Sequence, residues 1–270
     1  MTSSAGRSSP TSTRAAPARP SAIAAAIDVE LRRHRNPDRA PAEKAYLKSD
    51  LDFLGVGLPT MRTTVREIKR QYRALDRQGL VALVKMLWAR PVFERRMMAV
   101  LLLEAFEPLL RPADIALLER LIRESKTWAF VDELAIAITG RLVERNPELL
   151  QIIDRWARDS DFWLRRSAML ALLPPLRRGG GDFRRFARYA DRMLEETEFF
   201  IRKSIGWVLR ETGQAQPDTV YAWLLPRAAR ASGVTVREAV KYLSSTQRAA
   251  LLAAYTRAKH PGGASDRGPR

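Results

Sequence analysis

The chain has no cysteine and only two histidines among its 270 residues. Without cysteine, neither a disulfide nor a thiolate metal site can form, and the chain fits a reducing compartment. His34 and His260 stand near the two ends of the chain. Their scarcity argues against a histidine-based metal site and against a Ser-His-Asp triad. No tight acidic cluster indicates a magnesium site either, so we expect no metal and no cofactor.

Long apolar runs are also missing, and acidic residues are outnumbered. No run approaches the roughly 20 residues that cross a bilayer, so we expect no membrane span. The chain has 47 Lys and Arg against 30 Asp and Glu, a formal net charge of +17. This excess favours a polyanionic partner, nucleic acid before an anionic membrane surface. The alternative is a solubilising surface in an arginine-rich proteome.

The two ends differ in composition from the rest of the chain. Residues 1–20 are rich in Ser, Thr, Arg, Pro and Ala and contain no acid. We expect a disordered basic tail there, with a transit peptide as the alternative. Residues 259–270 contain "PGGASDRGPR" and predict a second disordered tail. Residues 21–258 are expected to form a single domain.

Between the tails the pattern is helical throughout. Apolar residues recur at three- and four-residue spacing, as in "IALLERLIRE" and "LVALVKMLWA", and convincing alternating strands are absent. Prolines and glycines punctuate the pattern at Pro91, Pro108, Pro112, Pro147, Pro174, Pro175, Gly179, Gly180, Gly181, Pro217 and Pro226. The sequence therefore predicts an all-α fold, with helices of about 10–18 residues joined by short loops.

An internal repeat runs through these helices. The stretch "DSDFWLRRSAMLAL" (159–172) aligns without a gap with "ETEFFIRKSIGWVL" (196–209), at an offset of 37 residues. "FERRMMAVLLL" and "WAFVDELAIAI" are weaker upstream copies, offset by 36 and 34 residues from the next copy along the chain. A period of this length built from helices predicts stacked helix pairs in a curved solenoid with a concave surface.

One position of the repeat carries a row of charges. Its occupants are Arg96, Asp132, Arg166 and Lys203. Cations at equivalent positions of stacked repeats match a phosphate backbone, although a solvated face is the alternative. Asp132 breaks the row. Either it pairs with a neighbouring arginine and sets the stacking, or it does chemistry where positive charge appears.

Two tryptophans flank this position. Trp128 lies one helical turn before Asp132, and Trp207 lies one turn after Lys203. Each tryptophan alone is more often a core residue than a site residue. On one concave surface with Asp132, the two rings would form an aromatic enclosure for a cationic group.

Six stretches carry a resemblance to a known family. They are "NPDRAPAEKAYLKSDLDFLGVGLP", "LWARPVFERRMMAVLLLE", "SKTWAFVDELA", "NPELLQIIDRWARDSDFWLRRSAML", "EFFIRKSIGWVLRE" and "VREAVKYL". With these stretches the chain resembles the bacterial alkylpurine DNA glycosylases built from HEAT-like repeats, the AlkD-type DNA alkylation repair enzymes. The resemblance covers about residues 28–245 and implies HEAT-like helical repeats stacked around a basic concave cleft.

The resemblance also implies an activity. Such enzymes excise cationic N3- and N7-alkylated purines, such as 3-methyladenine and 7-methylguanine, from duplex DNA by hydrolysing the N-glycosidic bond in base excision repair. By this resemblance the catalytic carboxylate falls on Asp132 and the ring walls on Trp128 and Trp207. Arg166 would hold the DNA backbone beside the lesion, and Tyr46 would line the same cleft.

Further expectations follow for the cleft and its partners. Lys203, Arg96 and Arg62 join Arg166 as predicted DNA-binding cations. Few lysines lie near the proposed site, so strand cleavage through a Schiff base is not expected and the enzyme should be monofunctional. We expect a monomer acting on double-stranded DNA in the bacterial cytoplasm, at the nucleoid. The alternatives are a non-catalytic helical-repeat scaffold for nucleic acid or protein, and a DNA-binding paralogue without activity.

One residue departs from the family pattern. After "FLGV" the better-known members have a long polar side chain, where this chain has Gly57. A glycine removes volume from the cleft beside the lesion. We expect Gly57 to widen the cleft for bulky adducts, as needed by family members that protect producer organisms against DNA-alkylating natural products. Ordinary sequence drift is the alternative.

Overall fold

The computed structural model describes residues 19–259, and this part of the chain is built from helices. Its one pairing of β type is an isolated bridge between Asp52 and Val92. The predicted all-α class is therefore confirmed. The two predicted tails lie outside the described residues except at their inner ends. There Pro20 begins the first helix and Lys259 ends the last.

The α-helices follow one another with short connections. They are α1 (Pro20–Arg33), α2 (Ala40–Leu47), α3 (Leu58–Gln71), α4 (Arg77–Trp88), α5 (Phe93–Ala105), α6 (Ile115–Ser125), α7 (Trp128–Glu133), α8 (Gly140–Arg145), α9 (Leu150–Trp156), α10 (Phe162–Ala171), α11 (Leu173–Arg177), α12 (Phe183–Met193), α13 (Phe199–Gly213), α14 (Pro217–Leu224), α15 (Gly233–Ala239) and α16 (Ser245–Lys259). Short 3₁₀ turns are η1 (Glu107–Leu109), η2 (Pro112–Asp114), η4 (Pro147–Leu149), η5 (Leu225–Arg227) and η6 (Val240–Tyr242). A π-helical turn, η3 (Leu134–Thr139), joins α7 to α8.

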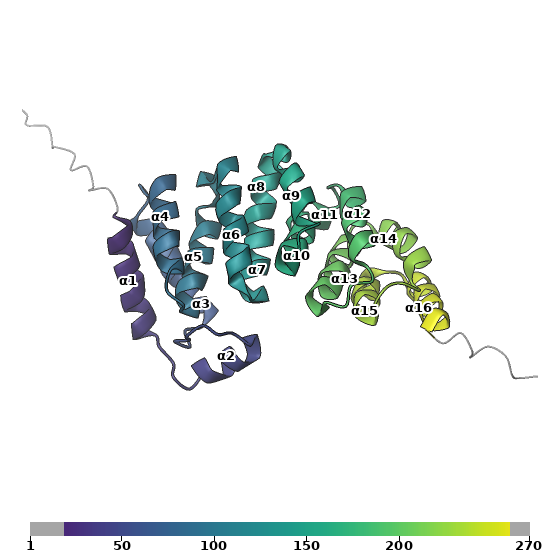
Figure 1. The fold of residues 1–270 in the computed structure, drawn as a ribbon, viewed down its shortest axis with the longest axis horizontal. Helices are drawn as coiled ribbons and strands as arrows, with labels where there is room; N and C mark the ends of the chain where they lie inside the picture. The colour runs from purple at the N-terminus through teal and green to yellow at the C-terminus, as the bar shows by residue number, and fades with distance from the viewer. Residues whose placement is uncertain (1–18, 260–270) are drawn as a thin grey trace, which may run out of the picture.

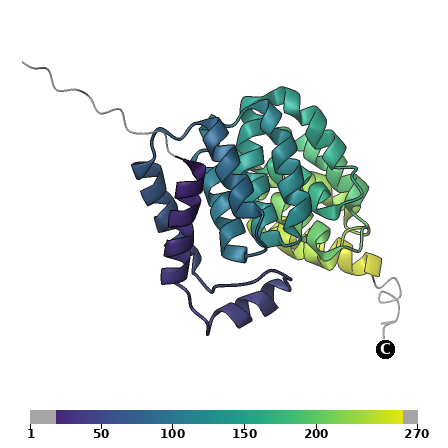
Figure 2. The ribbon, with the colours of Figure 1, turned by 60° about the vertical axis from the view of Figure 1, so that its left-hand side comes forward.

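The helices stack side by side in a bent row. Figure 1 shows the row running from α1 on the left to α16 on the right and arching over α2, which hangs below it. Helices α5, α7, α10, α13 and α15 pack against one another in sequence and form the inner layer. Helices α4, α6, α9, α12 and α14 form the outer layer. Figure 2 shows the same stack from the side, with α2 standing apart from the layered helices.

The repeat period reappears in the polar contacts between layers. Many side-chain hydrogen bonds join residues about one repeat apart in the sequence. Examples at separations of 36 and 37 residues are Arg77–Asp114, Trp88–Glu124, Trp156–Glu119, Arg123–Asp159 and Arg227–Asp191. Each bond ties one repeat to the next, so the predicted stacking of repeats is present in the structure.

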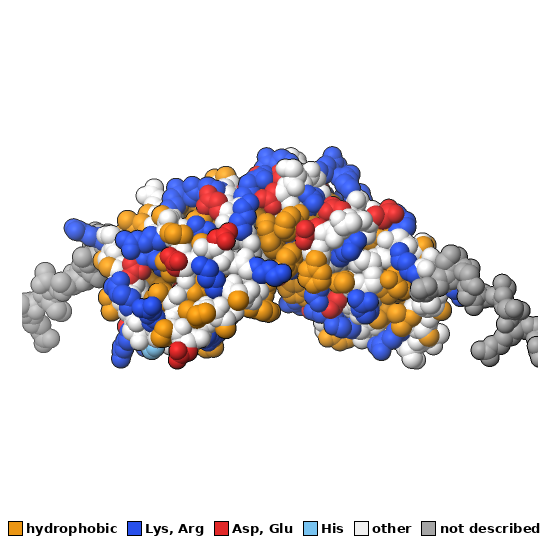
Figure 3. All heavy atoms as spheres, turned by 60° about the horizontal axis from the view of Figure 1, so that its bottom comes forward, with side chains coloured by type: hydrophobic (Ala, Val, Ile, Leu, Met, Phe, Trp, Pro, Cys, Tyr) orange, Lys and Arg blue, Asp and Glu red, His pale blue; other side chains and the backbone are white. Residues whose placement is uncertain are grey.

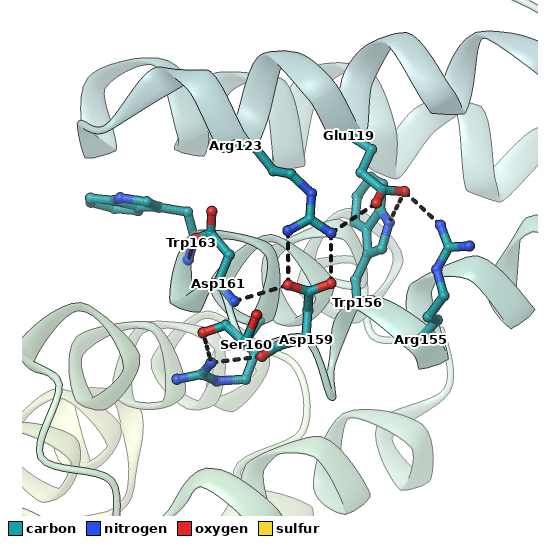
Figure 4. A network of polar contacts seen from close by, with 9 residues as sticks. Glu119, Arg123, Arg155, Trp156, Asp159, Ser160, Asp161 and Trp163 are labelled. Atoms are coloured by element: carbon teal, nitrogen blue, oxygen red, sulfur yellow. Dashed lines mark hydrogen bonds and ion pairs between the residues drawn. The ribbon is translucent and has the colours of Figure 1, made fainter.

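Figure 4 shows one of these polar contacts between repeats in detail. Arg123 of α6 donates hydrogen bonds of 2.9 and 2.6 Å to the two carboxylate oxygens of Asp159, beyond the end of α9. These bonds lower the pKa of Asp159. Glu119, one turn earlier on α6, accepts hydrogen bonds from Arg155 at 2.6 Å and from the Trp156 indole at 2.9 Å. Paired charges of this kind fix how adjacent outer helices are placed.

The apolar core lies between the two layers. Its largest fully buried side chains include Phe130 of α7, Trp156 of α9 and Phe186 of α12. One row of apolar side chains from each helix meets its neighbours there, as the helical periodicity predicts. The polar faces are left for the inner and outer surfaces of the arch.

The segment that carries α2 is attached through a buried carboxylate. Helix α2 has no buried residue of its own. Glu94 of α5 is fully buried, and its carboxylate accepts backbone N–H hydrogen bonds from Leu54, Gly55 and Val56 at 2.7–3.2 Å. Gly55 has φ +78°, and a Cβ there would lie 2.1 Å from the Asn36 carbonyl oxygen, so only glycine fits. This anchor sets where α2 can lie below the arch.

Candidate active site

Six of the predicted site residues meet around one cavity of about 370 Å³. The cavity is lined by Tyr46, Trp128, Asp132, Arg166, Phe199, Phe200, Lys203, Trp207 and Arg210. The lining residues come from α7, α10 and α13, which carry the repeated motif, and from α2. Among the lining residues Asp132 is the only acid.

Helix α7 places Trp128 and Asp132 on the same side. The Thr127 hydroxyl caps its first turn by accepting from the Ala129 backbone N–H. Phe130 and Val131 point into the core and are fully buried. Trp128 and Asp132 occupy the opposite face one turn apart and remain partly exposed. The short helix thus presents a ring and a carboxylate to the cavity.

The Asp132 carboxylate is held by Arg166. The arginine donates two hydrogen bonds to it, Nε to Oδ1 at 2.7 Å and Nη2 to Oδ2 at 2.8 Å. Its third donor, Nη1, bonds the Phe200 carbonyl oxygen at 2.6 Å. Arg166 is only 3 % exposed. A bidentate pair of this kind fixes the plane of the carboxylate.

The contact between Arg166 and Asp132 concerns the two interpretations of Asp132, as a structural partner of an arginine or as a catalytic group. The alternative in which Asp132 pairs with a neighbouring arginine matches the geometry. The guanidinium of Arg166 is directed at Asp132 and at a backbone carbonyl, and not toward open solvent. A contact between Arg166 and a DNA phosphate stays a prediction.

Aromatic rings surround the carboxylate. Tyr46 and Trp128 meet edge to face, with ring centroids 6.1 Å apart. The Arg166 guanidinium lies 5.8 Å from the Phe200 ring centroid and 5.9 Å from that of Trp207. Tyr46 is 74 % exposed although its neighbour Trp128 is only partly exposed. Tyr46 therefore presents most of its side chain to solvent at the side of the enclosure formed by α2.

Sequence reasoning missed three lining residues, Phe199, Phe200 and Arg210. Phe199 is 54 % exposed at the first turn of α13. The signal was present in the repeat itself, because the aromatic pair in "EFFIRKS" occupies the same place as "DFW" in the preceding copy. Arg210 lies two turns beyond Lys203 and had no motif to mark it.

The cations of α13 share one carboxylate. Lys203 bonds Glu238 of α15 at 2.6 Å, Arg210 bonds its other oxygen, and Lys241 joins at 3.1 Å. Burial would raise the pKa of Glu238, but hydrogen bonds from Lys203 and Lys241 and the charge of Arg210 outweigh it and lower the pKa to about 2. Glu238 therefore stays ionised and holds two cavity cations at the edge of the site.

Arg96 and Arg62 lie outside the cavity. Arg96 stacks 5.0 Å from the Trp88 ring centroid and bonds the Trp88 carbonyl at 3.2 Å, so it fastens α5 to α4. Arg62 of α3 bridges Glu104 at 3.0 Å and Glu133 at 2.8 Å. Burial, together with the neighbouring Glu104 carboxyl, raises the pKa of Glu133.

Arg62 belongs to a second, basic hollow that is lined by residues of α3, α5, η1 and α8. Arg66, Lys69 and Arg141 line this hollow with it, beside Glu104. The π-turn η3 helps to place Arg141, because a π-turn contains one more residue than an α-turn. Without that residue, Arg141 would be rotated by about 100° relative to Asp132. Figure 3 shows the underside of the arch, with apolar side chains near its hollowed middle and Lys and Arg on both sides.

Gly57 caps the start of α3 and does not line the cavity. A Cβ at this position would lie 2.7 Å from Nη1 of Arg39, the end of a flexible and exposed side chain. The space that the glycine leaves is therefore beside Arg39. An effect of Gly57 on adduct size stays a prediction.

No group of three or more His, Cys, Asp or Glu within residues 19–259 could hold a metal ion. No helix in that part of the chain is long and apolar enough to span a membrane.

Comparison with known proteins assigns the chain to a family. A family model described as DNA alkylation repair enzyme matches residues 27–243. The chain therefore belongs to the DNA alkylation repair enzyme family, and the resemblance seen in its sequence is confirmed. No curated protein matches it.

Solved structures agree in fold. A structure described as a predicted DNA alkylation repair enzyme from Enterococcus faecalis shares 21 % identity, with a TM-score of 0.70 over 78 % of this chain and 98 % of that one. AlkD2 from Streptococcus mutans shares 20 % identity, with a TM-score of 0.55 over 76 % of this chain and 100 % of that one. These likenesses confirm the stacked helical repeats.

The Glu238 cluster predicts a pH-dependent stability. The folded pKa of about 2 lies below the ordinary value of 4.5, so the ionised carboxylate stabilises the fold above about pH 4.5. That contribution is lost as the pH falls from about 4.5 to 2. Glu238→Gln should lower the free energy of unfolding at pH 7 by on the order of 3 kcal/mol, and the deficit should shrink across that acidic range.

Denaturant unfolding at several pH values measures this effect. Glu148→Gln serves as the control, because Glu148 is exposed and has no ion pair within residues 19–259. A deficit for Glu238→Gln that stays constant from pH 7 to pH 2 would contradict the proposed role of its charge.

Proposed function

We propose that this protein is a monofunctional DNA glycosylase that hydrolyses the N-glycosidic bond of cationic N3- and N7-alkylated purines in duplex DNA. Membership of the DNA alkylation repair family supports the class of damage. The observation that carries the proposal is Asp132, a single carboxylate among nine lining residues, oriented by Arg166 and enclosed by aromatic rings. An acid in that position is suited to a reaction in which positive charge develops.

The substrate supplies much of the driving force. Alkylation at N3 or N7 makes the purine cationic, so it leaves with the electron pair of the N-glycosidic bond as a neutral base. No general acid has to protonate it, which fits a cavity lined by no histidine. As the bond breaks, positive charge moves to the deoxyribose, as in the oxocarbenium-like transition state of glycoside hydrolysis.

Asp132 supplies the negative charge opposite the deoxyribose. Its carboxylate stabilises the developing cation and orients a water toward the anomeric carbon. The water oxygen forms the new bond, and its proton is released to the carboxylate or to solvent. Because Arg166 holds both carboxylate oxygens, the group needs little reorganisation when the charge appears. Such preorganisation is the main source of electrostatic catalysis.

The remaining lining groups fit the DNA around the lesion. Trp128 and Trp207 pack against the sugar and exclude water, and their ring faces attract the cation. Lys203 and Arg210 lie at the edge of the cavity, 39 % and 22 % exposed, where phosphates of the strand pass. Tyr46 closes the side formed by α2. In this proposal one monomer acts on one duplex, without a cofactor.

The open edge of the cavity suits large as well as small adducts, and Gly57 is the residue we propose to test. Gly57→Gln should slow release of a bulky N3-adenine adduct by a factor on the order of ten relative to release of 3-methyladenine, because the family resemblance implies that a long side chain at this position borders the lesion. Chromatography of the freed bases measures both rates. Equal changes for the two substrates would remove this role of Gly57.

Asp132→Asn is the direct test of the proposed chemistry. Wild-type protein should release 7-methylguanine or 3-methyladenine from methylated duplex DNA. The variant should be slower by about 10²–10³-fold, because it lacks the charge opposite the developing cation. Single-turnover base release, followed by chromatography, gives the rate of the chemical step.

Glu133→Gln is the matched control. Glu133 is the next carboxylate on the same helix, but it faces Arg62 outside the cavity, so the rate should change only a few-fold. Equal losses in the two variants would contradict the assignment to Asp132. Duplex binding without release of any base, small or bulky, would instead support the alternative of a non-catalytic scaffold.

A further inference from the structure

Arginines on the outer layer of the arch are usually paired with acids. Arg77 binds Asp114, Arg123 binds Asp159, and Arg155 binds Glu119. Further along the stack, the same holds for Arg227 with Asp191 and Arg230 with Glu195. Each pair joins one repeat to the next. On this side of the protein, a paired arginine is therefore the ordinary, structural arrangement.

The surface between α9 and α12 departs from that arrangement. Arg158, just after α9, and Arg184, Arg188 and Arg192 of α12 are exposed. Within residues 19–259 none of the four has an ion pair. We call these four residues the outer arginine cluster.

Nearby acids do not neutralise the cluster. Asp154 accepts a hydrogen bond from the Tyr189 hydroxyl and lies 3.8 Å from Arg185. Asp159 is bonded to Arg123 (Figure 4). Asp191 is bonded to Arg227 at 2.5 and 3.0 Å. The acids are thus committed to contacts between repeats, and the excess positive charge of the cluster is left to solvent.

The cluster has the shape of a groove. Arg158, Arg188 and Arg192 line one hollow of about 130 Å³ with Asp154 and Tyr189. A wider, adjoining hollow of about 540 Å³ shares Arg158 and Asp154 with it. Arg184, Arg188 and Arg192 stand at four-residue intervals, so they follow one face of α12 at steps of about 6 Å. A line of cations with this spacing fits a linear polyanion better than a single small anion.

The groove lies on the other side of the stack from the candidate active site. Helices α9 and α12 pack on α10 and α13. In Figure 1 they lie above those helices, whereas α2, whose Tyr46 lines the catalytic cavity, lies below them. A ligand in the groove therefore does not occupy the cavity.

We propose that the outer arginine cluster binds the phosphate backbone of a second duplex DNA segment while the concave side holds the first. Arginine forks recognise phosphodiester oxygens, and a row of them binds DNA without reading its sequence. A membrane surface fits less well, since it would need apolar side chains to insert. None of the large exposed apolar residues within residues 19–259 belongs to α9 or α12.

Binding two DNA duplexes at once affects how the protein moves between DNA segments. A protein that touches a second duplex before it leaves the first can transfer between them without passing through bulk solution. The proposal does not depend on base excision, because it needs only undamaged DNA. Its failure and a failure of the glycosylase proposal are therefore separable.

The proposal is tested by measuring how many DNA duplexes bind to one protein chain. Sedimentation velocity with short, labelled, undamaged duplexes should give two duplexes for one wild-type chain at low salt. The triple variant Arg158→Gln, Arg188→Gln, Arg192→Gln should bind one. Affinity for the second duplex should fall with salt with a log–log slope of about −3.6, roughly 0.9 for each of the four arginines, and that binding should be absent in the variant.

A matched variant controls for the loss of net charge. Lys85, Arg111 and Arg257 are also exposed and without an ion pair within the described residues, but they lie on α4, before α6 and on α16. Replacing all three with Gln should leave two duplexes bound. Base release by the cluster variant should equal that of wild type, because none of its residues lines the catalytic cavity.

Several outcomes would overturn the proposal. One duplex on the wild-type chain, or two on the cluster variant, shows that the cluster is not a second DNA site. Equal losses in the cluster and control variants show a general effect of charge. Binding of phosphatidylglycerol vesicles that the cluster variant abolishes, with no second duplex on wild type, would assign the surface to membranes instead.

Discussion

The contact between Arg166 and Asp132 is the interaction on which the site depends. A guanidinium that is 3 % exposed requires a carboxylate close by, since an unpaired charge at that depth is strongly unfavourable. Asp132 accepts from it with both oxygens, and the Phe200 carbonyl oxygen accepts from Nη1. One arginine thereby ties α7, α10 and α13 together. The same bond that stabilises the stacking leaves a carboxylate fixed in plane at the base of an aromatic cavity.

The stacked repeats explain how this contact arises. Hydrogen bonds between neighbouring repeats recur at separations close to the repeat length, and the bond from Arg166 to Asp132, at 34 residues, is one of them. In other repeats the charged position makes contacts between neighbouring helices. At Asp132 the same position also faces a cavity. Arg96 is an example of the ordinary case, since it stacks on Trp88 and bonds backbone carbonyls. The carboxylate that we propose as the catalytic group therefore belongs to the same set of contacts that joins the repeats, with a local change of residue at one repeat.

Much of this was predictable from the sequence, and the reasons are physical. Helical periodicity and the 37-residue offset indicated stacked helices, and they placed Trp128, Asp132 and Trp207 on one surface. The side-chain partners were not predictable, because they depend on how far α10 approaches α7. For that reason the sequence left open whether Asp132 pairs with a neighbouring arginine, and it did not indicate that Arg62 bridges two glutamates. Spacing determines which residues share a face, but only packing determines which atoms meet.

A double-mutant cycle on Asp132 and Arg166 tests the central claim most directly. Single-turnover base release would be measured for wild type, Asp132→Asn, Arg166→Gln and the double variant, with thermal unfolding to confirm that each is folded. If Arg166 acts through the carboxylate, the double variant should be no slower than Asp132→Asn alone. Losses that multiply would show that Arg166 contributes independently of the carboxylate, and would contradict the account.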